Sequence, residues 1–105
     1  MQNLFESIPQ ELPEELTEVL NVSENVRIER VVSRGHASPE GFWYDQAQRE
    51  FVLLLQGSAA LEFEGREAPV EMGPGDFLVI EAHQRHRVTR TARDEDTVWL
   101  AVHFG

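Results

Sequence analysis

FVLLLQGSAALEFEG, residues 51–65, contains two apolar segments separated by Gly57-Ser58. The first segment is a nearly continuous apolar run, as expected for a strand that is buried on both faces. The Gly57-Ser58 dipeptide is typical of a tight turn. After the turn the residues alternate, which predicts a second strand with Leu61 and Phe63 facing inward and its glutamates facing outward. We therefore expect a β-hairpin here, at the centre of the fold.

Short β-type runs continue on both sides of this hairpin, and turns rich in glycine and proline separate them. These runs are VRIERVVS (26–33), PVEM (69–72), FLVIE (77–81), HRVTRT (86–91) and TVWLAVHF (97–104). In the last run, Trp99, Ala101 and His103 share one face of the strand. A chain of 105 residues has room for one domain. The pattern predicts a single-domain, all-β sandwich or barrel.

The first 25 residues differ from the rest of the chain. A proline precedes EELTEVL (14–20), within which Leu16 and Val19 recur at helical spacing. Proline suits the first turn of a helix, and glutamates suit the positive end of its dipole. We expect an N-terminal segment with one short helix over residues 1–25, followed by a β-barrel over residues 26–105.

The chain is strongly acidic, with 19 Asp and Glu against 9 Lys and Arg, which gives a formal net charge of −10. This charge repels a polyanion, so we expect no nucleic-acid partner. The chain has no cysteine, which excludes disulfides, CxxC zinc sites and cysteine nucleophiles. No apolar run approaches the roughly 18 residues of a membrane span, and the N-terminus has no signal-like pattern. We expect a cytoplasmic protein that does not contact a membrane.

Two spaced motifs contain the residues that could carry chemistry. Glu50 precedes Gly57 with the spacing Glu-x6-Gly. Further along, GDFLVI (75–80) leads through a loop to His83 and His86, a His-x-x-His pair at the start of a predicted strand. Residues three apart in an extended chain face opposite sides, so both histidines can meet one ion only if His83 lies in the turn before the strand.

Together, at this spacing and in this strand pattern, the two motifs resemble those of the cupin superfamily, among its small single-domain members. The resemblance runs from about residue 26 to residue 104. It implies a jelly-roll β-barrel, a homodimer, and one divalent metal held by two histidines and a glutamate of the first motif and a histidine of the second. Two of these ligands carry over to this chain, Glu50 and His86.

The sequence departs from the family pattern at the His-x-His of the first motif. Those two positions fall on Trp43 and Asp45, and a register shift by one residue offers Tyr44 and Gln46 instead. We expect a metal site formed by mixed carboxylate and imidazole ligands, suited to Zn, Fe, Mn or Ni. Its predicted ligands are His86, Glu50, Asp45 and His83. Alternatively, an arginine (Arg34, Arg49 or Arg90) compensates the negative charge of a buried Glu50 without any metal.

Aromatic and basic residues define a candidate ligand pocket. Trp43 and Tyr44 are either barrel core or dimer contact, or they line a pocket with an apolar wall and one hydroxyl. In a regular strand Arg90 shares a face with His86, so we expect it to point into the pocket and bind an anionic ligand. His36 is interpreted as a solvent-exposed loop residue. His103 is interpreted as a structural strand histidine, unless the face that it shares with Trp99 is the interior.

Three functions are possible for a protein that binds a small molecule at this site. The first is a metal-dependent cupin enzyme of the oxygenase, isomerase or lyase type, with the metal as Lewis acid or dioxygen site. The second is a metal-free binding or sensor module that uses Trp43, Tyr44 and Arg90. The third is a metal-free isomerase or epimerase in which His86 and Tyr44 are the catalytic acid–base pair.

Overall fold

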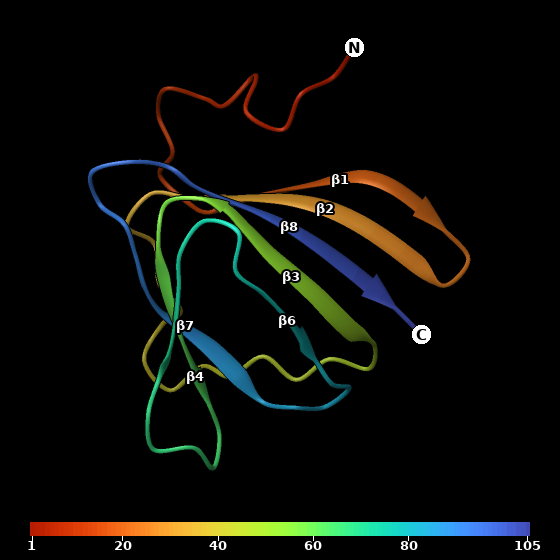
Figure 1. Ribbon diagram of the computed structural model, residues 1–105, viewed down its shortest axis with the longest axis vertical. Coiled ribbons are helices and arrows are strands. Elements are labelled where there is room, and N and C mark those ends of the chain that lie inside the picture. The colour runs from red at the N-terminus through yellow and green to blue at the C-terminus, as the bar shows by residue number, and fades with distance from the viewer.

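A computed structural model describes all residues from 1 to 105 as two antiparallel β-sheets and no helix (Figure 1). The eight strands are β1 (Leu16–Ser23), β2 (Val26–Ser33), β3 (Arg49–Gln56), β4 (Ala59–Phe63), β5 (Val70–Met72), β6 (Phe77–Ile80), β7 (His86–Thr91) and β8 (Thr97–Phe104). The larger sheet has the order β1-β2-β8-β3-β6, and the smaller sheet has the order β5-β4-β7. The all-β prediction is confirmed. No helix of the structure is long and apolar enough to cross a membrane.

The stretch 51–65 forms two strands, but they do not pair as a hairpin. β3 lies in the larger sheet and β4 in the smaller one, so Gly57 and its neighbour carry the chain from one sheet to the other. Gly57 has φ +91°, and a Cβ built there would lie 2.7 Å from Cα of Thr97. Only glycine fits a left-handed turn this close to another backbone. The predicted alternation in β4 is confirmed, since Leu61 and Phe63 are buried.

The core fills the space between the sheets. It contains Val52, Leu54, Ala59, Leu61, Phe63, Met72, Ile80 and Trp99. The inward residues of β3 and β8 therefore pack on those of β4, as expected for two sheets that each hide one face. Beyond this cluster the inward positions become polar, and the candidate site lies there.

The helix predicted over residues 14–20 is wrong, because these residues enter strand β1. β1 pairs with β2 so that Glu18 is opposite Arg30, and a bulge follows between Val19 and Asn21. Helix propensity is a weak preference that strand pairing overrides. The expected boundary between residues 25 and 26 falls in the turn between two strands of one sheet, so the structure shows no separate N-terminal segment there.

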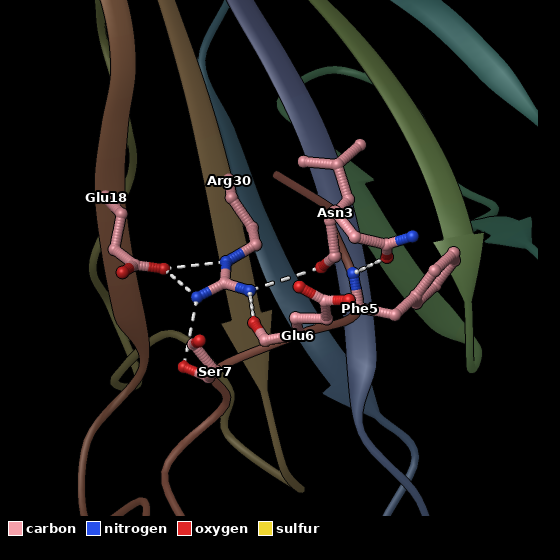
Figure 2. Close-up of polar contacts among 7 residues, drawn as sticks. Asn3, Phe5, Glu6, Ser7, Glu18 and Arg30 are labelled. Atoms are coloured by element: carbon pink, nitrogen blue, oxygen red, sulfur yellow. Dashed lines mark hydrogen bonds and ion pairs between the residues drawn. The ribbon is translucent and has the colours of Figure 1, made fainter. Parts of the chain in front are cut away.

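Arg30 fixes the first residues of the chain against the larger sheet (Figure 2). Its side chain is buried, and its guanidinium bonds the Glu18 carboxylate. It also donates to the carbonyl oxygens of Leu4, Glu6 and Ser7, at 3.2, 2.5 and 3.4 Å. A buried cation needs such partners, and here the N-terminal backbone supplies them.

Candidate functional site

A cavity of about 220 Å³ opens between the two sheets next to the core. Its polar lining comes from both sheets and from the segment that precedes β1. The polar residues are Glu15, Thr17, Arg27, Glu29, Tyr44, Gln46, Glu50, His86 and His103. Its apolar wall includes Val52, Leu61 and Trp99. A partly apolar cavity with converging polar groups is the usual form of a small-molecule site.

Glu50, on β3, lies at the centre of the polar groups. Its side chain is 13% exposed, and burial raises its pKa to about 7. The charges of Glu29 and Glu15 raise this pKa further, whereas Arg27 lowers it. A carboxyl with this pKa is present in both protonation states near neutral pH, so it can both accept and return a proton.

His86, at the start of β7, presents a proton acceptor to Glu50. Its Nδ1 donates to the carbonyl of Gln84 at 2.9 Å, which leaves Nε2 without a hydrogen in the neutral ring. Nε2 lies 3.8 Å from Oε1 of Glu50. Burial lowers the pKa of His86, and this keeps the ring neutral. The structure thus brings the two motif residues together, as the resemblance implies.

Tyr44 packs directly on His86. Its ring stacks on the imidazole with centroids 5.3 Å apart, and the two backbones exchange hydrogen bonds of 2.7 and 3.2 Å. Burial, together with the charges of Glu15 and Glu50, raises the pKa of Tyr44. The phenol therefore stays protonated at neutral pH and offers a hydroxyl to the cavity.

His103, interpreted from the sequence as structural, belongs to the site. On β8 it lies opposite both Arg27 of β2 and Glu50 of β3. Its Nε2 bonds Oε1 of Glu29 at 3.0 Å and lies 3.9 Å from Oε2 of Glu50. Arg27 donates to the other oxygen of Glu29 at 2.9 Å, so both oxygens of Glu29 have a partner within the protein.

Asp45 and His83 do not join the predicted ligand set. His83 lies in the turn before β7, as the metal hypothesis required, but its Nδ1 bonds Asp45 at 2.7 Å on the exposed surface. The strand-like alternation places Tyr44 and Gln46 in the cavity, and Trp43 and Asp45 outside its lining. The structure therefore adopts the register in which Tyr44 and Gln46, and not Trp43 and Asp45, take the two motif positions.

Arg90 also lies outside the cavity, which corrects the pocket prediction. It bonds Glu71 at 2.7 Å and Ser58 at 3.2 Å on the outer face of the smaller sheet. A register shift between β4 and β7 leaves Thr89 without a partner. Such a bulge reverses the alternation along the strand, so Arg90 faces away although His86 faces in.

The donor groups at the motif positions do not fit the metal that the resemblance implies. Tyr44, Gln46, Glu50 and His86 supply one carboxylate and one imidazole, with a protonated phenol and a neutral amide in place of two imidazoles. Gln46 Oε1 is buried and has no hydrogen-bond partner. In the whole chain no three His, Asp or Glu side chains are placed to hold one ion.

Comparison with known proteins agrees with this fold. A family model described as a cupin domain matches residues 31–103. A candidate mannose-6-phosphate isomerase from Ralstonia eutropha JMP134 is 49% identical, with a TM-score of 0.95 over 99% of this chain and 96% of that one. No curated protein matches the chain.

Two more distant structures share the fold alone. An RmlC-like cupin protein from Desulfovibrio desulfuricans is 20% identical, with a TM-score of 0.78 over 99% of this chain and 94% of that one. A cupin superfamily protein from Desulfitobacterium hafniense DCB-2 is also 20% identical, with a TM-score of 0.74 over 92% and 83% of the two chains.

Proposed function

The chain belongs to the cupin domain family, and we propose that it is a metal-independent isomerase that moves protons within a small hydroxycarbonyl compound. The position of Glu50 is the observation that carries this function. Its carboxyl lies 3.8 Å from Nε2 of His86 and 3.9 Å from Nε2 of His103, in the cavity. Both gaps exceed a direct hydrogen bond, so a substrate atom or a water can bridge each of them.

In this reaction Glu50 transfers a proton between neighbouring carbons. The carboxylate removes the proton from the carbon that bears a hydroxyl, while the Tyr44 hydroxyl donates to the carbonyl oxygen, which becomes the second hydroxyl of an enediol. His86 Nε2 accepts the proton of the original hydroxyl, and the Glu50 acid returns its proton to the former carbonyl carbon. Proton return from His86 to Tyr44, through the bound molecule or a water, completes the cycle. No oxidant, reductant or co-reactant is consumed.

The relative from Ralstonia eutropha supports an isomerase. Interconversion of an aldose and a ketose is this kind of proton transfer between neighbouring carbons. The similarity covers nearly the whole of both chains, so the comparison concerns one domain with one cavity.

Hydrogen–deuterium exchange at C2 of D-mannose and of D-mannose 6-phosphate tests the isomerase function. In D2O, proton NMR should show loss of the C2 proton signal and growth of the ketose signals, at the same rate before and after treatment with a chelator. Glu50→Gln should remove this exchange. Exchange that disappears with the chelator and returns with a divalent metal would instead support the metal-dependent enzyme.

A binding module is the second candidate, because the family's His-x-His is absent here. Its signature is a ligand that raises the unfolding temperature of the protein but undergoes no C2 exchange. That outcome would exclude the isomerase and retain the cavity as a binding site.

We also infer that two copies of this chain pair through the outer face of the larger sheet. Phe77 and Val79 on edge strand β6 are 65% and 43% exposed, and the Phe77 ring lies 5.5 Å from that of Phe51. Contiguous exposed apolar side chains mark an interaction site. Light scattering should give twice the chain mass of 12.0 kDa. Phe77→Ser should give the monomer, whereas Val22→Ser, at an exposed site on β1, should not. A monomeric native protein would overturn the inference.

A further inference from the structure

The cavity has a charge balance that selects among possible substrates. Glu15, Glu29 and Glu50 line it, and Arg27 is the only arginine that does so. The Arg27 guanidinium already donates to Glu29 at 2.9 Å. An incoming anion would therefore meet three carboxyl groups and one cation that is already paired.

A second cavity, of about 260 Å³, adjoins the first and is also lined by carboxylates. It shares Glu15, Tyr44 and Val88 with the first cavity and adds Glu14, together with His36 and Ser38 from the loop before β3. No arginine lines it. A ligand that extends from the first cavity into the second meets one further carboxylate, that of Glu14, and the hydroxyl of Ser38, but no guanidinium.

The arginines that could bind a phosphate nearby have other partners. Four of them bond elsewhere: Arg34 to Asp96, Arg85 to Glu64, Arg87 to the carbonyls of Ser38 and Pro39, and Arg90 to Glu71. Phosphate recognition uses guanidinium forks that are free to bond the anion. The chain keeps none at either cavity.

We propose that the two cavities bind an uncharged molecule rich in hydroxyl groups, and that a free sugar rather than its phosphate ester is the ligand. This inference rests on the proposed function and names its substrate class. Sugar hydroxyls donate to the carboxylates of Glu15 and Glu29, and one can satisfy Gln46 Oε1, which has no partner in the protein. A phosphate dianion would instead be repelled by those carboxylates.

Titration of the native protein with D-mannose and with D-mannose 6-phosphate tests the substrate class. Chemical shifts of the Trp99 indole, in the cavity wall, should report a dissociation constant for the free sugar at least about tenfold below that for its phosphate ester. Equal or tighter binding of the ester would overturn the proposal. So would the absence of binding by the free sugar up to about 50 mM.

A charge variant identifies the source of the discrimination. Glu15→Arg should bind the phosphate ester at least about tenfold more tightly than the native protein does. Glu24→Arg is the matched control, since Glu24 lies in the exposed turn between β1 and β2 and changes the net charge equally. If both variants bind the ester equally well, the cavity charge does not set specificity. These titrations measure binding, so a protein that binds the sugar without C2 exchange disproves the isomerase alone.

Discussion

Glu50 and His86 lie 3.8 Å apart, both largely buried, and their pKa values shift in opposite directions. Burial raises the pKa of the carboxyl to about 7 and lowers that of the imidazole, because each charged form loses water. Near neutral pH neither group carries a permanent charge. The pair can therefore exchange protons with a bound molecule at little cost.

Glu50→Gln should change how the stability of the protein depends on pH. The folded pKa of Glu50, about 7, exceeds its ordinary value of 4.5, so folding favours the protonated form. Its contribution is fully present below pH 4.5 and is lost as the pH rises through 7. Ionising this carboxyl in the folded state costs roughly 3 kcal/mol. Urea unfolding should show a stability difference between acid and alkaline pH that is smaller in the variant by an amount of this order.

Glu67→Gln is the control for that measurement, because it removes an exposed carboxyl that does not line the cavity. It should leave the pH dependence of native stability unchanged. His86 contributes in the opposite direction, since its lowered pKa favours folding above its ordinary value. A variant of Glu50 with the native pH dependence would show that folding does not raise the pKa of this carboxyl.

Glu29→Gln should shift the pH profile of C2 exchange toward lower pH. The negative charge of Glu29 raises the pKa of Glu50, and Arg27 lowers it. The variant removes the first effect and frees Arg27 for the second, so Glu50 ionises at lower pH. As the pH is raised through the titration of Glu50, the rate of C2 exchange should therefore increase at a lower pH than in the native protein. A lower rate of C2 exchange with an unshifted pH profile would mean that Glu29 only maintains the structure of the site.

Tyr44→Phe should slow C2 exchange by about 100-fold with little change in the free energy of unfolding. The phenyl ring retains the stacking on His86 and the backbone bonds to it, and only the hydroxyl is lost. Ligand affinity should fall much less than the exchange rate, because the hydroxyl acts on the carbonyl oxygen as it gains charge. Native exchange rates in this variant would assign the donor role to another group.

Strand positions could be predicted from the sequence, but the partners of the strands could not. The runs at 26–33, 86–91 and 97–104 coincide with β2, β7 and β8, because each shows turns at its ends and apolar alternation. The stretch 51–65 gives two strands for the same reason. Its pattern cannot tell that Gly57 turns the chain toward the opposite sheet, since that depends on how closely Thr97 approaches.

The site was predictable only where spacing alone defines it. Glu50 and His86 follow from the two motifs. Which of two neighbouring residues faces inward depends on a one-residue register, and this reversed the roles expected for Asp45 and Gln46. In the same way, the bulge between β4 and β7 turns Arg90 away from the cavity. His103 pairs with Glu29, 74 residues away, through strand order, and its only sequence signal was the face it shares with Trp99.

Arg30→Met should destabilise the protein by roughly 2 kcal/mol and release the first residues of the chain. The buried guanidinium bonds the Glu18 carboxylate and three backbone carbonyls of the N-terminal segment, so its loss leaves all of them unpaired. Urea unfolding and limited proteolysis before residue 16 measure the two effects. Arg66→Met, at an exposed site, is the control. Unchanged proteolysis in Arg30→Met would show that other contacts fix this segment.

Gly57→Ala should be far more damaging than Gly65→Ala, although both glycines have positive φ, of +91° and +87°. An alanine in this conformation costs about 1 kcal/mol at either site. At Gly65 the added methyl meets nothing within 4 Å, whereas at Gly57 it would lie 2.7 Å from Cα of Thr97 and 2.9 Å from the carbonyl oxygen of Asp96. Backbone atoms cannot move aside without separating β3 from β8, which pair at Gln56 and Val98, so Gly57→Ala should cost roughly 2–3 kcal/mol more. Equal unfolding free energies for the two variants would mean that the chain crosses between the sheets less tightly than this contact requires.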